Sequence, residues 1–134
     1  MKTLPPYLLH IMAIEQHQVM PMLLNACPSF RDTWEASLKR SDTALLYISL
    51  GEFARHLREL YIIDNVSEFP AVATVIENLH INGTPYVKEA ASVGLLENIQ
   101  NSWRNNGIDP EEFAKFLKPE SKKWWKSLND FWNE

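Results

Sequence analysis

Helix-starting and helix-ending residues divide this chain into short segments, and this punctuation limits the fold more than any other feature. Proline, glycine and the capping residues Ser, Thr and Asp stand where helix boundaries need them. Between them, apolar residues recur at i, i+3, i+4 and i+7, the spacing that gives a helix one buried face. Only Leu45 to Ser49 could instead form a short extended piece. The pattern predicts an all-α protein.

Capping signals place the individual helices. Ser49 and Glu52 have the spacing of a capping box, and Thr84-Pro85 and Asp109-Pro110 each join a cap to a proline in the first turn. We expect helices from Ser29 to Arg40, from Ser49 to about Ile62, from Ser67 to Gly83, from Thr84 to about Arg104, a short one after Asp109 that Pro119 ends, and a last one around Trp124 to Trp132.

Two of these helices have unusual apolar patterns. The helix after Thr84 is apolar on several sides and contains Gly94, which predicts that another helix approaches it closely, although a simple bend would also fit. The last helix is expected to pack its aromatic stripe into the core, with lysines on the opposite side. The stripe consists of Trp124, Trp125, Leu128, Phe131 and Trp132.

The first 25 residues are the least defined part of the predicted fold. Pro21 interrupts an apolar-rich stretch, which predicts either a kinked helix or an irregular arm followed by a short helical turn. The apolar residues from Leu4 to Ile14 faintly resemble an export signal, but Pro5 and Pro6 interrupt them. No stretch reaches the roughly 20 consecutive apolar residues of a membrane helix. We therefore expect a cytoplasmic chain.

The length and the cysteine content fit one domain that folds without disulfide bonds. The chain has 134 residues, enough to bury roughly two thirds of the surface that its unfolded form exposes. Cys27 is the one cysteine, so no internal disulfide can form, and it is expected to act as a small buried apolar residue. We predict a single helical domain over residues 1–134, with about six or seven helices in an irregular antiparallel bundle or a stack of helix pairs.

The motifs of common enzyme classes are missing from the sequence. The glycines are isolated, so no phosphate-binding loop occurs, and no Gly-x-Ser-x-Gly elbow frames a serine. Glu77 and His80 have the Glu-x-x-His spacing of di-iron proteins, and Glu52, His56 and Glu59 share one helical face. A di-iron site needs a second Glu-x-x-His pair, which the chain lacks. We expect no metal, no cofactor and no enzymatic activity.

The charges are divided unevenly along the chain. Residues 1–114 contain 14 acids and 8 bases, a net charge of −6, whereas residues 115–134 contain five lysines and three acids, a net charge of +2. Affinity for nucleic acid comes from clustered Lys and Arg, so the acidic body argues against direct nucleic-acid binding. An ordinary soluble surface would explain these charges, but an acidic face would also suit a basic protein partner.

Several segments carry a resemblance to known proteins: Cys27-Pro28-Ser29-Phe30 with Trp34, Phe53 to Leu57, Phe69-Pro70 with Ile76-Glu77, and above all Tyr86 to Ala91 with Gly94 to Asn101. The resemblance covers about residues 26 to 132, and the family it points to consists of small bacterial helical proteins that are similar to the immunity proteins of polymorphic and contact-dependent toxin systems. It implies a binding role without catalysis and transfers no site residue.

The resemblance and the charge division together favour a cytoplasmic immunity protein that binds and blocks a cognate toxin domain, with a basic nuclease as the expected target. The candidate contacts are Glu52, His56, Glu59, Glu77, Glu89, Glu97 and Asn101. For Glu89 and Glu97, a role as buried partners of helix ends is the rival interpretation. One alternative is a small regulatory or adaptor protein, as a monomer or a weak homodimer through the last helix. Another is a metal-dependent enzyme, which would need Glu77, His80 and His56 in one cluster.

Overall fold

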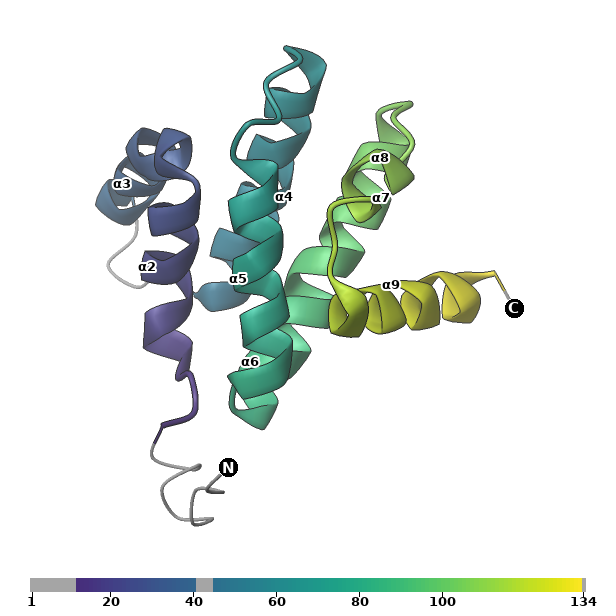
Figure 1. Ribbon diagram of the computed structural model, residues 1–134. Helices are drawn as coiled ribbons and strands as arrows, with labels where there is room; N and C mark the ends of the chain where they lie inside the picture. The colour runs from purple at the N-terminus through teal and green to yellow at the C-terminus, as the bar shows by residue number, and fades with distance from the viewer. Residues whose placement is uncertain (1–11, 41–44, 134) are drawn as a thin grey trace.

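The computed structural model describes residues 12–40 and 45–133, and these ranges are helical apart from short connections (Figure 1). The elements are α2 (Gln16–Ala26), the 3₁₀ turn η1 (Pro28–Phe30), α3 (Arg31–Arg40), α4 (Leu46–Ile62), α5 (Phe69–Asn82), α6 (Pro85–Glu89), the π-helical segment η2 (Ala90–Leu96), α7 (Glu97–Asn105), α8 (Glu111–Ala114) and α9 (Pro119–Trp132). Because α6, η2 and α7 follow one another without a break, they form one long helix. The predicted all-α fold with six or seven helices is confirmed.

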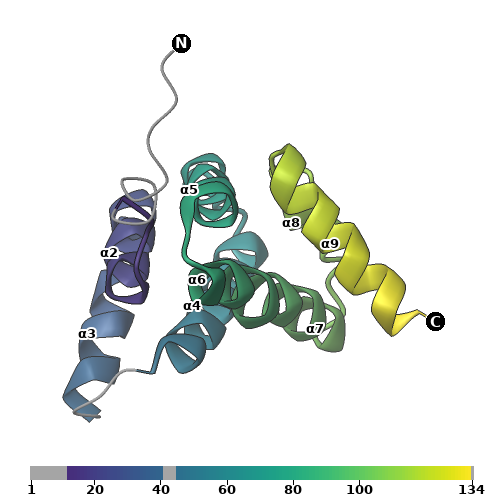
Figure 2. The same ribbon diagram turned by 90° about the horizontal axis from the view of Figure 1, so that it is seen from below.

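Helices α4 and α5 lie in the middle of the molecule. Helices α2 and α3 are on one side of them and α9 is on the other, in both views (Figures 1 and 2). Helix α4 packs along η2 and α7, whereas α5 lies between α2 and α9. The segment before α2 is held by an isolated bridge, in which the Ile14 amide donates to the Asn82 carbonyl at 2.9 Å and the Thr84 amide donates to the Ile14 carbonyl at 3.0 Å.

One hydrophobic core runs through these layers, from Ile14 near the start of the described chain to Trp125 in α9. The predicted stripes of α4 and α5 are buried in it. Its largest fully buried side chain, Trp103 of α7, has its ring centroid 5.9 Å from that of Phe113 and 6.3 Å from that of Phe69. The core is thus shared by segments far apart in sequence, as expected for one cooperative unit.

Gly94 lies at a close contact between the long helix and α4. A Cβ atom at this position would stand 3.0 Å from Leu50 Cδ1 and 3.2 Å from Tyr47 Cδ1, both in α4. The predicted close approach of another helix is therefore confirmed. The same contact lies within η2, where the helix is locally widened to the π form. Such widening is common at functional sites and at places where a helix adapts its packing.

The start of α4 differs from the prediction. The helix begins at Leu46, so Ser49 is a buried residue inside it rather than its cap, and Leu46 to Ser49 are helical rather than extended. The physical reason is that Leu46 and Leu50 continue the apolar stripe by one more turn, and their contact with the core outweighs the local capping preference. Glu52, released from the predicted capping box, accepts a hydrogen bond from Ser37 Oγ at 3.0 Å instead.

The aromatic stripe of α9 is also placed differently from the prediction. Trp125 is buried and Leu128 is partly buried, but Trp124, Phe131 and Trp132 are 44%, 65% and 56% exposed. The reason is that α9 contacts α5 and η2 along a narrow face that contains Ser121 and Trp125. The second half of the helix then leaves the body of the molecule, as Figure 1 shows. Three large side chains that were assigned to the core are therefore on the surface.

The amino-terminal region is described only from residue 12 onward. Helix α2 continues through Pro21, which lies five residues after the first residue of the helix. The helix has buried residues both before and after this proline. Residues 1–11 of the predicted arm, including Leu4, Pro5 and Pro6, lie outside the described residues. Within the described ranges, no helix combines the length and apolar character needed to cross a bilayer.

Candidate functional site

A cluster of reactive side chains lies where the turn before α3 meets the central helices. Cys27 stands between α2 and η1, Ser29 is in η1, His56 is in α4, and Glu68 is the residue that precedes α5. Cys27 is fully buried, whereas His56 and Glu68 are partly exposed. We call these four residues the Cys27 cluster. They come from the turn around η1, from α4 and from the start of α5, so the cluster forms only when these segments pack together.

The Ser29 hydroxyl is the centre of the Cys27 cluster. It donates a short hydrogen bond to Glu68 Oε1 and lies 2.8 Å from His56 Nε2 and 3.6 Å from Cys27 Sγ. Because its proton points to Glu68, it accepts from Nε2–H of His56. Glu68 also accepts from the Ser29 amide at 3.2 Å and from the Cys27 thiol at 3.5 Å. The carboxylate therefore holds the turn that leads into α3.

Burial favours the neutral forms of Cys27 and His56 in this cluster. It raises the pKa of the Cys27 thiol to about 12, and the negative charge of Glu68 acts in the same direction although the hydrogen bond with Ser29 opposes it. Burial also lowers the pKa of His56, although Glu68 and Glu59 act against this shift. A protonated thiol is a poor nucleophile, so Cys27 is not activated for covalent chemistry in this state.

A surface groove opens next to His56. Its volume is about 350 Å³, and it is lined by Thr33, Glu52, Arg55, His56 and Glu59. We call it the α4 groove, because all of these residues except Thr33 belong to α4. The side chain of Glu59 is 63% exposed and pairs with Arg58, whose Nη1 donates to Ser102 Oγ of α7 at 2.7 Å. The groove therefore offers accessible carboxylates on a helix that α7 holds in place.

A second polar network crosses from α5 to α9. Ser121 Oγ donates to Glu77 Oε1 at 2.9 Å and lies 2.9 Å from His80 Nδ1, and Ser92 Oγ of η2 lies 3.0 Å from His80 Nε2. Since the Ser121 proton goes to Glu77, Nδ1 of His80 must donate to Ser121, and Nε2 of neutral His80 then accepts from Ser92. In this series of hydrogen bonds, the hydroxyl and imidazole protons are thus all directed toward Glu77.

The ionisation states agree with that order of donors. For Glu77, burial alone would raise the pKa, but the amides of Ser121 and Glu120 and the Ser121 hydroxyl donate to the carboxylate, and the net effect is a lowered pKa. The His80 side chain is 3% exposed, and burial lowers its pKa in spite of the neighbouring carboxylates. At neutral pH, a charged Glu77 therefore faces a neutral His80 through Ser121.

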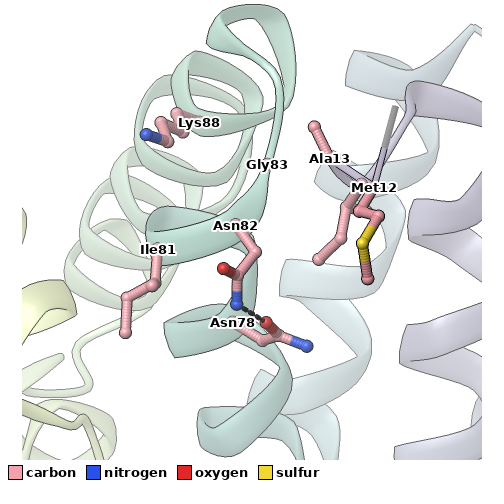
Figure 3. Close-up of a pocket in the computed structure, with 8 residues that line it drawn as sticks. Met12, Ala13, Asn78, Ile81, Asn82, Gly83 and Lys88 are labelled. Atoms are coloured by element: carbon pink, nitrogen blue, oxygen red, sulfur yellow. Dashed lines mark hydrogen bonds between the residues drawn. The ribbon is translucent and has the colours of Figure 1, made fainter. Parts of the chain in front are cut away.

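An apolar surface pocket of about 340 Å³ lies above this network. Pro85, Lys88, Glu89, Ser92, Val93 and Trp124 line it. The Trp124 ring stacks on His80 with a centroid distance of 6.3 Å and an interplanar angle of 16°, so it covers the imidazole. A larger hollow of about 570 Å³ lies beyond Lys88, between the end of α5 and residues 12–14; Figure 3 shows Asn78, Ile81 and Asn82 on one side of it and Met12 on the other.

The structure brings only some of the predicted contact residues together. Glu52, His56 and Glu59 line the α4 groove. Glu77 instead binds the start of α9, and Glu89 lies at the apolar pocket. Glu97 and Asn101 lie on α7, where Glu97 is partly exposed and Asn101 is exposed. The predicted contact set is therefore spread over several surfaces.

The rival interpretation for Glu89 is wrong, because its side chain is exposed and does not serve as a buried partner of a helix end. Two partly exposed acids, Glu68 and Glu77, instead accept backbone amides at the starts of η1 and α9. Both residues belong to the region of α5, and each bonds to a partner about 40 residues away in the sequence: 39 positions for Ser29 and 43 and 44 for Glu120 and Ser121. Sequence spacing could not reveal these pairs.

The candidate metal ligands are also regrouped. The enzyme alternative needs Glu77, His80 and His56 together, but the structure divides them, with Glu77 and His80 in one network and His56 in the Cys27 cluster. A set of three donors that sequence reasoning missed is Cys27, His56 and Glu68. The only sequence signal for it was the presence of Cys27, Ser29 and His56 in segments that carried the resemblance. Glu68 carries no signal in the sequence that distinguishes it from the other acids.

Comparison with known proteins identifies a family without assigning an activity. A family model described as a domain of unknown function, DUF7674, matches residues 20–133. No curated protein and no solved structure matches the chain. The matched region begins within α2 and ends after α9, so it includes the Cys27 cluster, the α4 groove and the network around His80.

Proposed function

We propose that this chain, which belongs to the DUF7674 family, is a cytoplasmic immunity protein that binds a cognate bacterial toxin domain and blocks it. The expected target is a basic nuclease domain, because proteins that act on nucleic acid usually present clustered Lys and Arg. Neutralisation would then need only tight binding over the active cleft, with no reaction at the immunity protein.

The observation that supports this proposal most directly is the α4 groove. Glu52 and Glu59 stand on its rim with His56 between them along α4, and only Arg55 opposes their charge within the lining. Carboxylates at the edge of a hollow can mimic the phosphates that a nuclease cleft would otherwise bind, and they accelerate encounter with a basic surface. The net charge of −6 over residues 1–114 acts in the same direction.

Rigid support for the groove also fits a binding role. Arg58 bonds to Ser102 of α7, and Ser37 of α3 bonds to Glu52, so both neighbouring helices fix the side chains that flank the hollow. A preorganised surface loses less side-chain entropy when a partner binds. The groove is therefore suited to present its charges in one arrangement.

The test is co-expression with the toxin domain encoded by the adjacent upstream gene. We expect the two proteins to copurify and the chain to protect cells from the toxin. Their association rate should fall as the ionic strength rises, because steering by charge is screened by salt. Failure both to copurify and to protect would overturn the proposal.

A charge-matched pair of variants then locates the contact. Glu59→Lys at the groove should slow association and weaken protection, whereas Asp130→Lys on α9 changes the net charge equally at a site far along the chain. Both residues are exposed, so neither change should unfold the protein. Equal effects of the two variants would show that the overall charge matters and that the α4 groove does not.

A second candidate function is a regulatory or adaptor protein that acts through self-association. The observation in its favour is the exposed end of α9, where Phe131 and Trp132 face solvent with ring centroids 5.4 Å apart. Isolated exposed aromatics are common, but an adjacent pair of this size is typical of interaction surfaces. This function needs no toxin partner and is tested separately below.

A further inference from the structure

We propose that Cys27, His56 and Glu68 form a zinc-binding site. This inference goes beyond the proposed partner-binding role and does not depend on it. The three donor atoms, Cys27 Sγ, one imidazole nitrogen of His56 and one Glu68 carboxylate oxygen, all lie within 4.8 Å of one another. A thiolate, an imidazole and a carboxylate are all established zinc ligands.

One pair of donors already has the spacing of a tetrahedral zinc site. With the usual zinc–ligand bond lengths, donor atoms around the ion stand about 3.4 to 3.6 Å apart. Cys27 Sγ and Glu68 Oε1 are already 3.5 Å apart. The Ser29 hydroxyl lies between the donors, 2.8 Å from His56 Nε2 and 3.6 Å from Cys27 Sγ. Rotation of this one serine side chain would therefore free the space that the ion needs.

The charges of the three ligands balance the ion. Zinc carries two positive charges, which one thiolate and one carboxylate neutralise, while neutral imidazole adds none. On binding, the Cys27 S–H bond breaks, a sulfur–zinc bond forms and the proton is released to solvent. The His56 proton moves from Nε2 to Nδ1, so that the Nε2 lone pair faces the ion. No oxidation or reduction is involved.

Access and coordination number follow from the position of His56. This residue belongs to both the Cys27 cluster and the lining of the α4 groove, so an ion would approach the cluster from the groove side. Three protein ligands leave a fourth position, which a water molecule can occupy from the groove side. Because the ligands come from the α2–η1 junction, α4 and the start of α5, the ion would also tie the amino-terminal helices to the central pair.

Cobalt titration tests the assignment spectroscopically. Untagged protein is stripped with a chelator, kept reduced, and titrated with Co²⁺. We expect a thiolate-to-cobalt charge-transfer band and the visible bands of tetrahedral cobalt, both saturating at one equivalent and both lost when Zn²⁺ is added. Cys27 is the one cysteine of the chain, so the charge-transfer band identifies its ligand without any variant. A titration without this band overturns the proposal.

Variants then test the ligand set. Cys27→Ser should remove the charge-transfer band and weaken zinc binding by more than about 100-fold, since even the loss of an outer-shell partner costs 10 to 100-fold. Glu68→Gln keeps an oxygen acceptor for the Ser29 amide while removing the charge, and should also weaken binding. Exposed His17 of α2 lies outside the cluster, so His17→Ala is the matched control and should bind as the wild type does.

Two further measurements distinguish a metal site from a cluster that is only hydrogen-bonded. Ser29→Ala removes the central hydroxyl and should preserve or strengthen zinc binding, whereas loss of binding would contradict the ligand set. Zinc should raise the melting temperature of the wild type and leave that of Cys27→Ser unchanged. Equal zinc affinity in the wild type and in a folded Cys27→Ser, checked by circular dichroism, would overturn the proposal.

Discussion

Two buried glycines have opposite expected responses to the same substitution. At Gly51 of α4, an added Cβ would meet Arg55 Nη1 at 3.6 Å and Asn98 Oδ1 at 3.8 Å, which are ordinary contacts, whereas at Gly94 it would stand 3.0 Å from Leu50 Cδ1. Alanine gains up to ~1 kcal/mol over glycine inside a helix. We expect Gly51→Ala to raise the free energy of unfolding by about that amount and Gly94→Ala to lower it by about 1 to 2 kcal/mol. Urea denaturation measures both, and a stabilising Gly94→Ala would contradict the close packing of η2 on α4.

His80 makes the stability depend on pH. Its pKa is lowered in the folded protein, mainly by burial and also by Lys88, while Glu77 and Glu120 oppose the shift. Between the folded value and the ordinary value of 6.5, the unfolded chain therefore binds more protons than the folded protein. We expect the free energy of unfolding to fall as the pH is lowered below about 6.5 and to level off below the folded pKa.

Urea denaturation of the wild type and His80→Gln, at about pH 7.5 and 5.5, checks this dependence. The variant should lose part of the pH effect. It should not lose all of it, because burial also lowers the pKa of His56, and that residue acts with the same sign. An unchanged pH dependence in His80→Gln would show that His80 is not the group responsible.

The elements show where the sequence was sufficient and where tertiary contacts decided. The Thr84 cap was predictable because it acts locally: its Oγ1 accepts from the Val87 amide, three residues on, at 3.2 Å. The Ser49 cap was plausible by the same local rule, but the core contact of Leu46 extended α4 past it. The predicted stripe of α9 failed for a related reason, since the width of a buried face depends on how many neighbours a helix has. Helical spacing alone does not contain that information.

Glu77 is the main polar attachment of α9. Its carboxylate accepts the Glu120 amide at 3.1 Å and both the amide and the hydroxyl of Ser121 at 2.9 Å, so it supplies the cap that Lys118 does not. Hydrogen bonds to charged groups contribute roughly 1.5 to 3 kcal/mol each, although such contributions are not additive. We expect Glu77→Ala to lower the free energy of unfolding by about 3 kcal/mol. Glu77→Gln, which keeps one oxygen acceptor, should cost less.

Hydrogen exchange shows whether this loss is local to α9. In Glu77→Ala, amides of residues 119–132 should exchange faster while those of α4 keep their protection. Trp125, the buried tryptophan of α9, should become accessible to solvent at the same time, and its fluorescence should report the change. Uniform loss of protection over the whole chain would mean that α9 and the central helices unfold as one unit.

At the scale of the whole molecule, the fold class was predictable and the composition of the site was not. Helix boundaries and stripes depend on neighbours within a few positions, so they are encoded in short windows. The Cys27 cluster joins residues 27, 29, 56 and 68, and Cys27 and Glu68 are 41 positions apart. The burial of Cys27 could be foreseen from its residue type, but its partners depend on how η1, α4 and α5 meet. For the same reason, only the members of the predicted contact set that share one face of α4 were found together.

The exposed end of α9 is the part of the molecule on which the homodimer alternative depends. Phe131 and Trp132 extend past the contact between α9 and the core, and burying such a pair against a second copy would remove a large apolar area from water. If the chain acts as a homodimer, light scattering at micromolar concentration should detect it, and Phe131→Ser with Trp132→Ser should return the protein to a monomer with an unchanged melting temperature. The α4 groove variant Glu59→Lys is the control, because it lies on a different helix and should leave the oligomeric state unaltered. If the wild-type protein stays monomeric over this concentration range, the homodimer alternative is ruled out. The exposed end of α9 would then be free for a different partner.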